Sequence, residues 1–121
     1  LCHELLHNLE FHLNNEGIYP FGNWSNYNPS DFYYDNSYTS NSGFDYTLNE
    51  DDKNNVYFID TYSHTYETED RARVFEKICP CESDSIVNDY PNLYQKGLYL
   101  KEEITTYYPS LAHTNLFNSL N

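Results

Sequence analysis

The chain has 121 residues, of which 19 are aspartate or glutamate and 6 are lysine or arginine, so its formal net charge is −13. A charge of this size should repel nucleic acid and anionic membranes, and we expect neither as a partner. The length allows one domain at most, and no apolar run is long enough to span a membrane.

An H-E-x-x-H motif, His3-Glu4-Leu5-Leu6-His7, stands at the start of the sequence. Residues four apart lie on the same face of an α-helix, so His3 and His7 can reach one metal ion while Glu4 projects beside them. Two neutral histidines, an open position for water and a carboxylate that takes the water's proton are what a mononuclear zinc hydrolase needs. The motif predicts one Zn²⁺ bound by His3 and His7, with Glu4 as the general base. The alternative is a surface helix that carries these residues by chance.

The first expected helix covers residues 1–14. Its leucines Leu6, Leu9 and Leu13 recur at helical spacing and should bury one face. Gly17 is a plausible end signal for this helix. Because the sequence opens inside the motif helix, we expect the chain to be the C-terminal part of a longer, zincin-like domain.

A long, aromatic-rich loop is expected over residues 15–55. The segment is dense in asparagine, serine, aspartate and tyrosine and has no sustained helical period. Its aromatic side chains can bury enough area to order it, and we expect the loop to cover one side of the zinc site, with a flexible insertion as the alternative. Its acidic run Glu50-Asp51-Asp52 lacks the spaced oxygen ligands of a calcium loop and predicts a solvated turn.

Two further helices are expected, and with little β-structure they make the fold mainly α. One covers residues from about 66 to 78, with Thr65 as its N-cap and acidic residues in its first turn. The other covers residues from about 92 to 107, between Pro91 and Pro109. Its predicted packing stripe consists of Leu93, Gly97, Leu100, Ile104 and Tyr107.

A single zinc needs a third protein ligand. His12 is rejected, because it points about 140° away from His7 around the helix. A carboxylate on the second expected helix can reach both histidines if the two helices pack side by side. The candidates on that helix are Glu67, Glu69, Asp70 and Glu76.

The three cysteines, Cys2, Cys79 and Cys81, do not form a disulfide framework, because their number is odd. Cys79-Pro80-Cys81 also lacks the two-residue gap of a C-x-x-C motif, so we expect thiols without a metal or redox role.

The motif and the segment Tyr62-Ser63-His64-Thr65-Tyr66-Glu67-Thr68-Glu69, followed by Ala72 and Phe75, carry a family resemblance. Together they resemble the gluzincin metallopeptidases of the anthrax lethal factor type, and also bacterial proteins described as zinc-binding metallopeptidases. In the lethal factor type a tyrosine lies seven residues before the liganding glutamate, as Tyr62 does before Glu69 here. The resemblance covers the motif helix and roughly residues 58–108.

This resemblance implies a zinc metallopeptidase that hydrolyses a peptide or protein substrate. It makes Glu69 the third zinc ligand and Tyr62 the hydroxyl that stabilises the oxyanion. It also implies an extracellular or cell-surface location. The lethal factor type carries an acidic residue four positions after the ligand, where this chain has Arg73, so the groups that support the zinc ligands must differ.

Two other readings stay open. In one, the chain binds zinc but is a non-catalytic module that recognises a surface through its aromatic loop. In the other, it is an acidic helical domain without metal.

Overall fold

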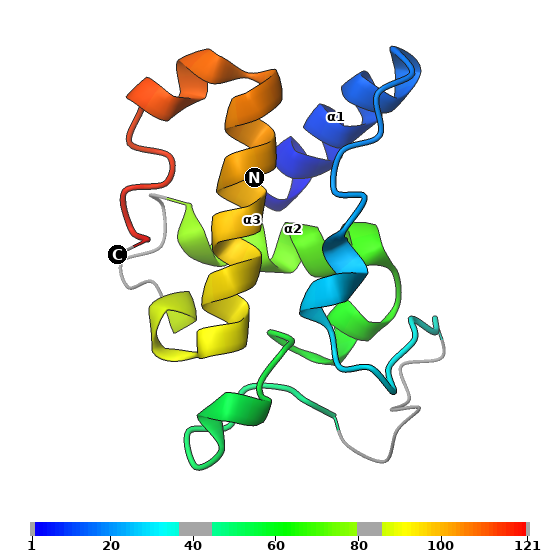
Figure 1. Cartoon of the computed structure of the whole chain (residues 1–121), viewed down its shortest axis with the longest axis vertical. Coiled ribbons are helices and arrows are strands. Elements are labelled where there is room, and N and C mark those ends of the chain that lie inside the picture. The colour runs from blue at the N-terminus through cyan, green and yellow to red at the C-terminus, as the bar shows by residue number, and fades with distance from the viewer. Residues whose placement is uncertain (1, 37–44, 80–85, 121) are drawn as a thin grey trace.

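The computed structural model describes residues 2–36, 45–79 and 86–120, and Figure 1 shows their arrangement. The α-helices are α1 (Cys2–Asn15), α2 (Glu67–Ile78) and α3 (Pro91–Tyr107). The described ranges also contain five short 3₁₀ helices. Four lie between the α-helices, namely η1 (Trp24–Tyr27), η2 (Lys53–Asn55), η3 (Thr61–His64) and η4 (Ile86–Asp89), and η5 (Pro109–His113) follows α3. Within the described ranges the only β-pairing is an isolated parallel bridge between Thr47 and Phe58. The prediction of a mainly α fold is confirmed.

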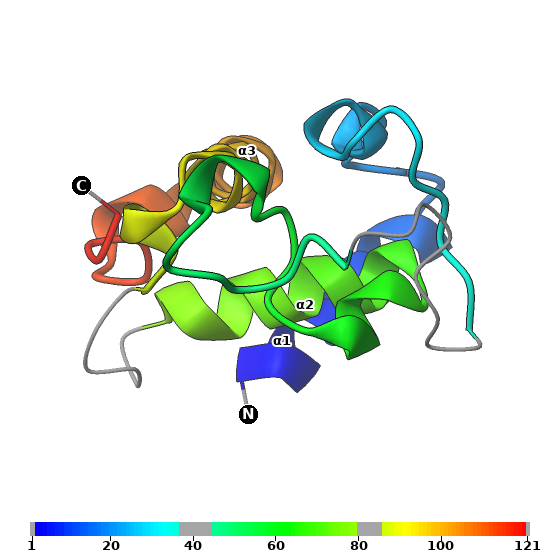
Figure 2. The same ribbon diagram turned by 90° about the horizontal axis from the view of Figure 1, so that it is seen from below.

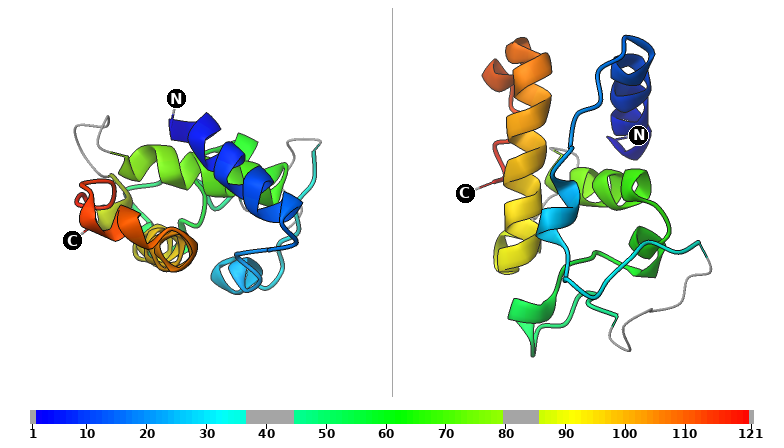
Figure 3. Two further views of the ribbon diagram at one scale, coloured as in Figure 1. Left: turned by 90° about the horizontal axis from the view of Figure 1, so that it is seen from above. Right: turned by 45° about the vertical axis from the view of Figure 1, so that its right-hand side comes forward.

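Helix α2 occupies the centre of the molecule, with α1 packed on one side and α3 on the other (Figure 2). Both α1 and α3 cross α2 steeply (Figure 3). The α1–α2 and α2–α3 contacts therefore use different faces of α2. None of the helices in the described part of the chain is both long and apolar enough to cross a membrane.

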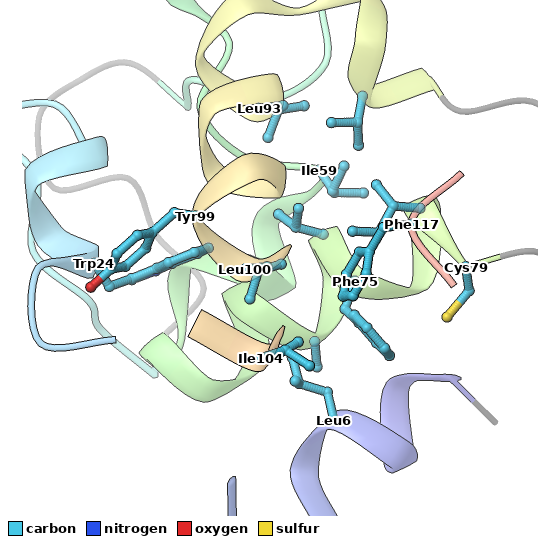
Figure 4. Close-up of a cluster of buried hydrophobic side chains, with 14 of the residues drawn as sticks. Leu6, Trp24, Ile59, Phe75, Cys79, Leu93, Tyr99, Leu100, Ile104 and Phe117 are labelled. Atoms are coloured by element: carbon cyan, nitrogen blue, oxygen red, sulfur yellow. The ribbon is translucent and has the colours of Figure 1, made fainter. Parts of the chain in front are cut away.

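The hydrophobic core lies where α2 meets its two neighbours (Figure 4). Ala72, Phe75 and Ile78 of α2 are buried, and so are four of the five predicted stripe positions of α3, namely Leu93, Gly97, Leu100 and Ile104. The prediction for Tyr107 is wrong, because its side chain is 39% exposed. Since α2 crosses α3 well before the end of α3, the stripe extends past the helix that covers it (Figure 1).

The ends of the helices follow local chemistry. Gly17 adopts φ +79° after α1, and the amides of Gly17 and Ile18 donate to the carbonyls of Asn14 and Leu13, which is a Schellman motif. The predicted N-cap Thr65 is wrong: α2 begins at Glu67 and its N-cap is Tyr66. The Thr65 hydroxyl donates instead to the Tyr62 carbonyl at 2.7 Å, which closes η3.

Aromatic side chains of the described part of the loop before α2 are buried against the helices. Trp24 is 1% exposed, and its ring stacks on Tyr99 of α3 at a centroid distance of 6.3 Å. The loop therefore packs against α3 at this point. Residues 37–44 of the expected loop, and Cys81, lie outside the described residues.

A buried ion pair joins α2 to α3. Lys96 Nζ lies 2.9 Å from Asp70 Oδ2, and neither side chain is exposed to solvent. The same oxygen accepts hydrogen bonds from the Tyr34 hydroxyl at 2.7 Å and the Trp24 indole at 3.2 Å. Burial lowers the pKa of Lys96, and the Asp70 carboxylate partly offsets this effect. Asp70 thus ties α2, α3 and the aromatic loop together.

We expect Lys96→Met to lower the free energy of unfolding by about 3–5 kcal/mol, because it leaves a buried carboxylate without its counter-charge. Urea denaturation measures this loss. The double variant Asp70→Asn with Lys96→Met should lose less than Lys96→Met alone, since both charges are then removed. Exposed Lys101→Met on α3 is the matched control, and a loss as large there would contradict the assignment.

Candidate metal centre

The two histidines of the motif and one glutamate of α2 converge at the α1–α2 interface. His3 Nε2 lies 3.4 Å from Glu69 Oε2, and His7 Nε2 lies 2.5 Å from Glu69 Oε1. The possible ligand atoms of the three residues all lie within 4.8 Å of one another. No second group of three or more His, Cys, Asp or Glu side chains with metal-binding geometry occurs in the described ranges.

The convergence depends on how α1 packs on α2. Arg71 donates from Nε and Nη2 to the Glu10 carboxylate, with the shortest distance 2.7 Å, and both side chains are buried. Glu10 lies one turn after His7 on α1, and Arg71 lies two residues after Glu69 on α2. This bidentate pair therefore fixes the position along α1 that faces Glu69.

Tyr62 lies beside the cluster. It comes from η3, whose N-cap Asp60 accepts a hydrogen bond from the Ser63 amide at 3.1 Å. The Tyr62 hydroxyl is hydrogen-bonded to the Glu69 carboxylate. Burial by itself would raise the pKa of Glu69, but the bond from Tyr62 and the nearby His7 and His3 together lower it below its ordinary value. Glu69 is therefore held as a carboxylate, the form that binds a metal.

The other acidic candidates on α2 lie elsewhere. Glu67 is exposed at the start of the helix, and Asp70 faces Lys96. Glu76 approaches His3 from the opposite side to Glu69, with Oε1 at 3.5 Å from Nδ1. Of the four candidates, Glu69 is the one that lies against Nε2 of both histidines.

Glu4 and His12 lie on the outer part of α1. Glu4 is exposed and lies in the helical turn between the two histidines. His12 is also exposed, and its Nε2 lies 3.3 Å from Glu16. His12 is not part of the cluster, in agreement with its rejection as a ligand.

The cluster fits a zinc ion in chemistry and nearly in size. Two imidazole nitrogens and a carboxylate are a recurrent ligand set of catalytic zinc sites, which keep the fourth position for water. Ligand atoms of a tetrahedral zinc lie about 3.4 Å apart, given metal–ligand distances near 2.1 Å. The distance from His3 Nε2 to Glu69 Oε2 already has this value, 3.4 Å. His7 Nε2 lies against the other oxygen, Oε1, at 2.5 Å, and this contact would open by about 1 Å if Oε1 were the ligand.

The site is accessible from solvent. The side chains of His3, His7 and Glu69 are 15%, 26% and 13% exposed. A hollow of about 360 Å³ adjoins His7, and its other lining residues are Asn8, Glu10, Phe11, Asn14 and Thr68. The candidate metal ligands are therefore partly desolvated, yet still accessible from solvent.

The contacts that Arg73 makes near the site were not predicted from the sequence. Arg73 lies with Nε 3.3 Å from Asp60 Oδ2 and donates from Nη1 to Glu76 at 2.9 Å. The guanidinium carbon of Arg73 also lies 4.7 Å from the centre of the Tyr62 ring. Arg73 thus contacts Asp60 and Tyr62, which precede α2, as well as Glu76 on α2. The spacing of Arg73 and Glu76, three residues apart on a helix, was a usable signal for their pairing.

Comparisons of this chain with protein-family models, with curated proteins and with solved structures find no match.

We expect the chain to bind one Zn²⁺, and His3→Ala, His7→Ala and Glu69→Ala each to weaken binding by about tenfold or more. Competition with a chromophoric chelator measures the affinity. Glu67→Ala removes a neighbouring exposed carboxylate and should leave the affinity unchanged. If Glu67→Ala weakened binding while Glu69→Ala did not, the ligand would be misassigned.

Proposed function

We propose that this protein is a zinc-dependent hydrolase of peptide bonds, of the zincin-like type with H-E-x-x-H and a downstream glutamate. The observation that carries the proposal is the convergence of His3, His7 and Glu69 at the α1–α2 interface. A purely structural zinc site would use four protein ligands, whereas this cluster offers three and is partly open to solvent. The extracellular or cell-surface location remains part of the proposal and rests on the family resemblance.

In this proposal His3, His7 and Glu69 hold the ion, and Glu4 moves the proton. Bound zinc supplies Lewis-acid chemistry and lowers the pKa of water towards 7. Glu4 accepts a proton from the attacking water and then donates it to the leaving amine, which is general base and general acid catalysis by one carboxylate. Its exposed position on α1 leaves it free to exchange that proton.

Tyr62 is the proposed oxyanion donor. Its hydroxyl bonds to Glu69, so the phenol oxygen already lies at the edge of the metal-binding atoms. When Glu69 turns its oxygen to a metal, the hydroxyl can exchange this bond for one to the substrate carbonyl oxygen. Such a bond strengthens as negative charge develops on that oxygen, so it favours the transition state over the bound substrate.

The hollow beside His7 is the proposed place for substrate residues next to the scissile bond. The amide groups of Asn8 and Asn14 can donate to and accept from a peptide backbone. Phe11 lies four residues after His7 on the same helix, and its side chain is 67% exposed. An apolar substrate side chain would cover this ring. The hollow thus combines one apolar contact with amide groups, as peptide sites commonly do.

A non-catalytic zinc-binding module is the second candidate. Exposed aromatic side chains on the loop favour it, since Tyr19 is 74% exposed and Tyr33 is 61% exposed. Aromatic side chains of this kind supply much of the contact in protein interfaces. The two candidates differ in what Glu4 does.

Glu4→Gln separates these two candidates. If Glu4 is the general base, the full-length variant should lose peptide cleavage by about 100- to 10,000-fold while it keeps its zinc. Cleavage of a fluorogenic peptide library, with metal content measured on the same samples, checks this. Glu16→Gln, an exposed glutamate after the same helix, is the matched control. Zinc-loaded wild-type protein that cleaves nothing would favour the binding module.

Tyr62→Phe tests the oxyanion donor. Loss of one such donor typically costs about 2.7–4 kcal/mol in the transition state, so kcat should fall by about 100- to 1000-fold with little change in KM. The measurement is made at saturating zinc, because Tyr62 also bonds to Glu69. Tyr66→Phe, which alters an exposed hydroxyl nearby, is the control. Wild-type kcat in Tyr62→Phe would end the assignment.

A further inference from the structure

Asp60, Arg73 and Glu76 form a chain of charged groups beside His3. Arg73 lies between Asp60 and Glu76, with Nε 3.3 Å from Asp60 Oδ2 and Nη1 2.9 Å from Glu76 Oε1. The second contact is a hydrogen bond from the guanidinium to the carboxylate. Arg73 therefore fixes the direction of the Glu76 carboxylate on the face of α2 that meets α1.

The free side of the His3 ring faces that carboxylate. His3 Nε2 points to Glu69 at 3.4 Å, and His3 Nδ1 lies 3.5 Å from Glu76 Oε1. The Nδ1 atom is buried, and among the described residues it has no hydrogen-bond partner within bonding distance. A contraction of a few tenths of an ångström would bring this pair within the usual range for an N–H···O bond, about 2.7–3.2 Å.

A histidine that binds a metal through Nε2 carries its proton on Nδ1, and an acceptor at Nδ1 fixes both the tautomer and the ring direction. We propose that Glu76, held by Arg73, is a positioning residue for His3 that accepts a hydrogen bond from Nδ1–H and so presents Nε2 to the metal. This inference rests on the proposed metal site. It assigns Glu76 a role outside the ligand set, although Glu76 is nearly as close to His3 (3.5 Å) as Glu69 is (3.4 Å).

Arg73 contributes in two ways to this arrangement. Its bond to Glu76 occupies one direction of the carboxylate, which keeps that group from turning into the cluster as a competing ligand. Its guanidinium also packs on the Tyr62 ring, at 4.7 Å from the ring centre. One arginine therefore holds a partner of His3 and the ring of Tyr62 at the same time.

The test is the affinity for Zn²⁺ alone, measured by chelator competition on the full-length protein. Glu76→Ala removes the acceptor and should weaken zinc binding by about 10- to 100-fold. Glu76→Gln keeps an uncharged oxygen acceptor and should lie between Glu76→Ala and wild type. Glu67→Ala, the matched removal of an exposed carboxylate from the same helix, should stay within about twofold of wild type, since Glu67 lies outside this chain of groups.

A second readout separates positioning from a general structural effect. Two-bond ¹H–¹⁵N NMR of the zinc-free protein reports which nitrogen of His3 carries the proton. Wild type should show more of the Nδ1–H tautomer than Glu76→Ala does, because the variant keeps the Glu69 carboxylate 3.4 Å from Nε2 but loses the acceptor that faces Nδ1. If Glu76→Ala does not fold, Glu76→Gln supplies both measurements, with weaker zinc binding and less Nδ1–H than wild type as the expected result.

The outcomes separate this inference from the proposed function. Wild-type protein that does not bind zinc through His3, His7 and Glu69 would overturn both. Wild-type protein that binds zinc there, with unchanged affinity and unchanged His3 tautomer in Glu76→Ala, would overturn the role of Glu76 and leave the proposed function standing.

Discussion

The buried ion pair between Glu10 and Arg71 is the contact on which the candidate site depends. It joins α1 to α2 close to His7 and Glu69, and so helps to set how the three candidate metal ligands face one another. A bidentate guanidinium–carboxylate pair suits this task because its planar geometry allows little sliding or rotation. Burying two charges is costly, and replacing such a pair by apolar residues is often neutral or stabilising. We therefore attribute its value here to the position that it specifies rather than to stability.

Three consecutive residues of α2 each contact a different neighbour. Glu69 faces the histidines of α1, Asp70 bonds to Lys96 of α3, and Arg71 bonds back to α1. Adjacent residues of a helix point about 100° apart, so successive side chains can reach different neighbours. The two residues that follow Glu69, Asp70 and Arg71, are therefore both buried and paired with an opposite charge. These pairs hold the backbone of α2 beside the candidate ligand, so that any adjustment on metal binding falls on the side chains.

The sequence predicted the parts of this structure that follow local rules. The H-E-x-x-H spacing, the apolar stripe of α3 and the end of α1 at Gly17 all depend on residues within a few positions of one another. The start of α2 was missed by one residue, because Thr65 bonds to the preceding turn rather than capping the helix. The buried charges were not predicted, since a charged residue in a helix normally indicates a solvent-facing side. Lys96 differs from the other buried charges. It directly precedes the stripe residue Gly97 on α3, and this position was a usable signal that its side chain is buried. The pairing of Glu10 with Arg71 joins residues 61 positions apart, and only the packing of the helices reveals it.

The most direct test of this account is the position of zinc in a crystal structure of the protein with equimolar Zn²⁺, located by anomalous scattering at the zinc edge. The account predicts one peak at about 2.0–2.2 Å from Nε2 of His3, Nε2 of His7 and one carboxylate oxygen of Glu69. A peak elsewhere in the molecule, or a metal at this place that Glu69 does not bind, would contradict it.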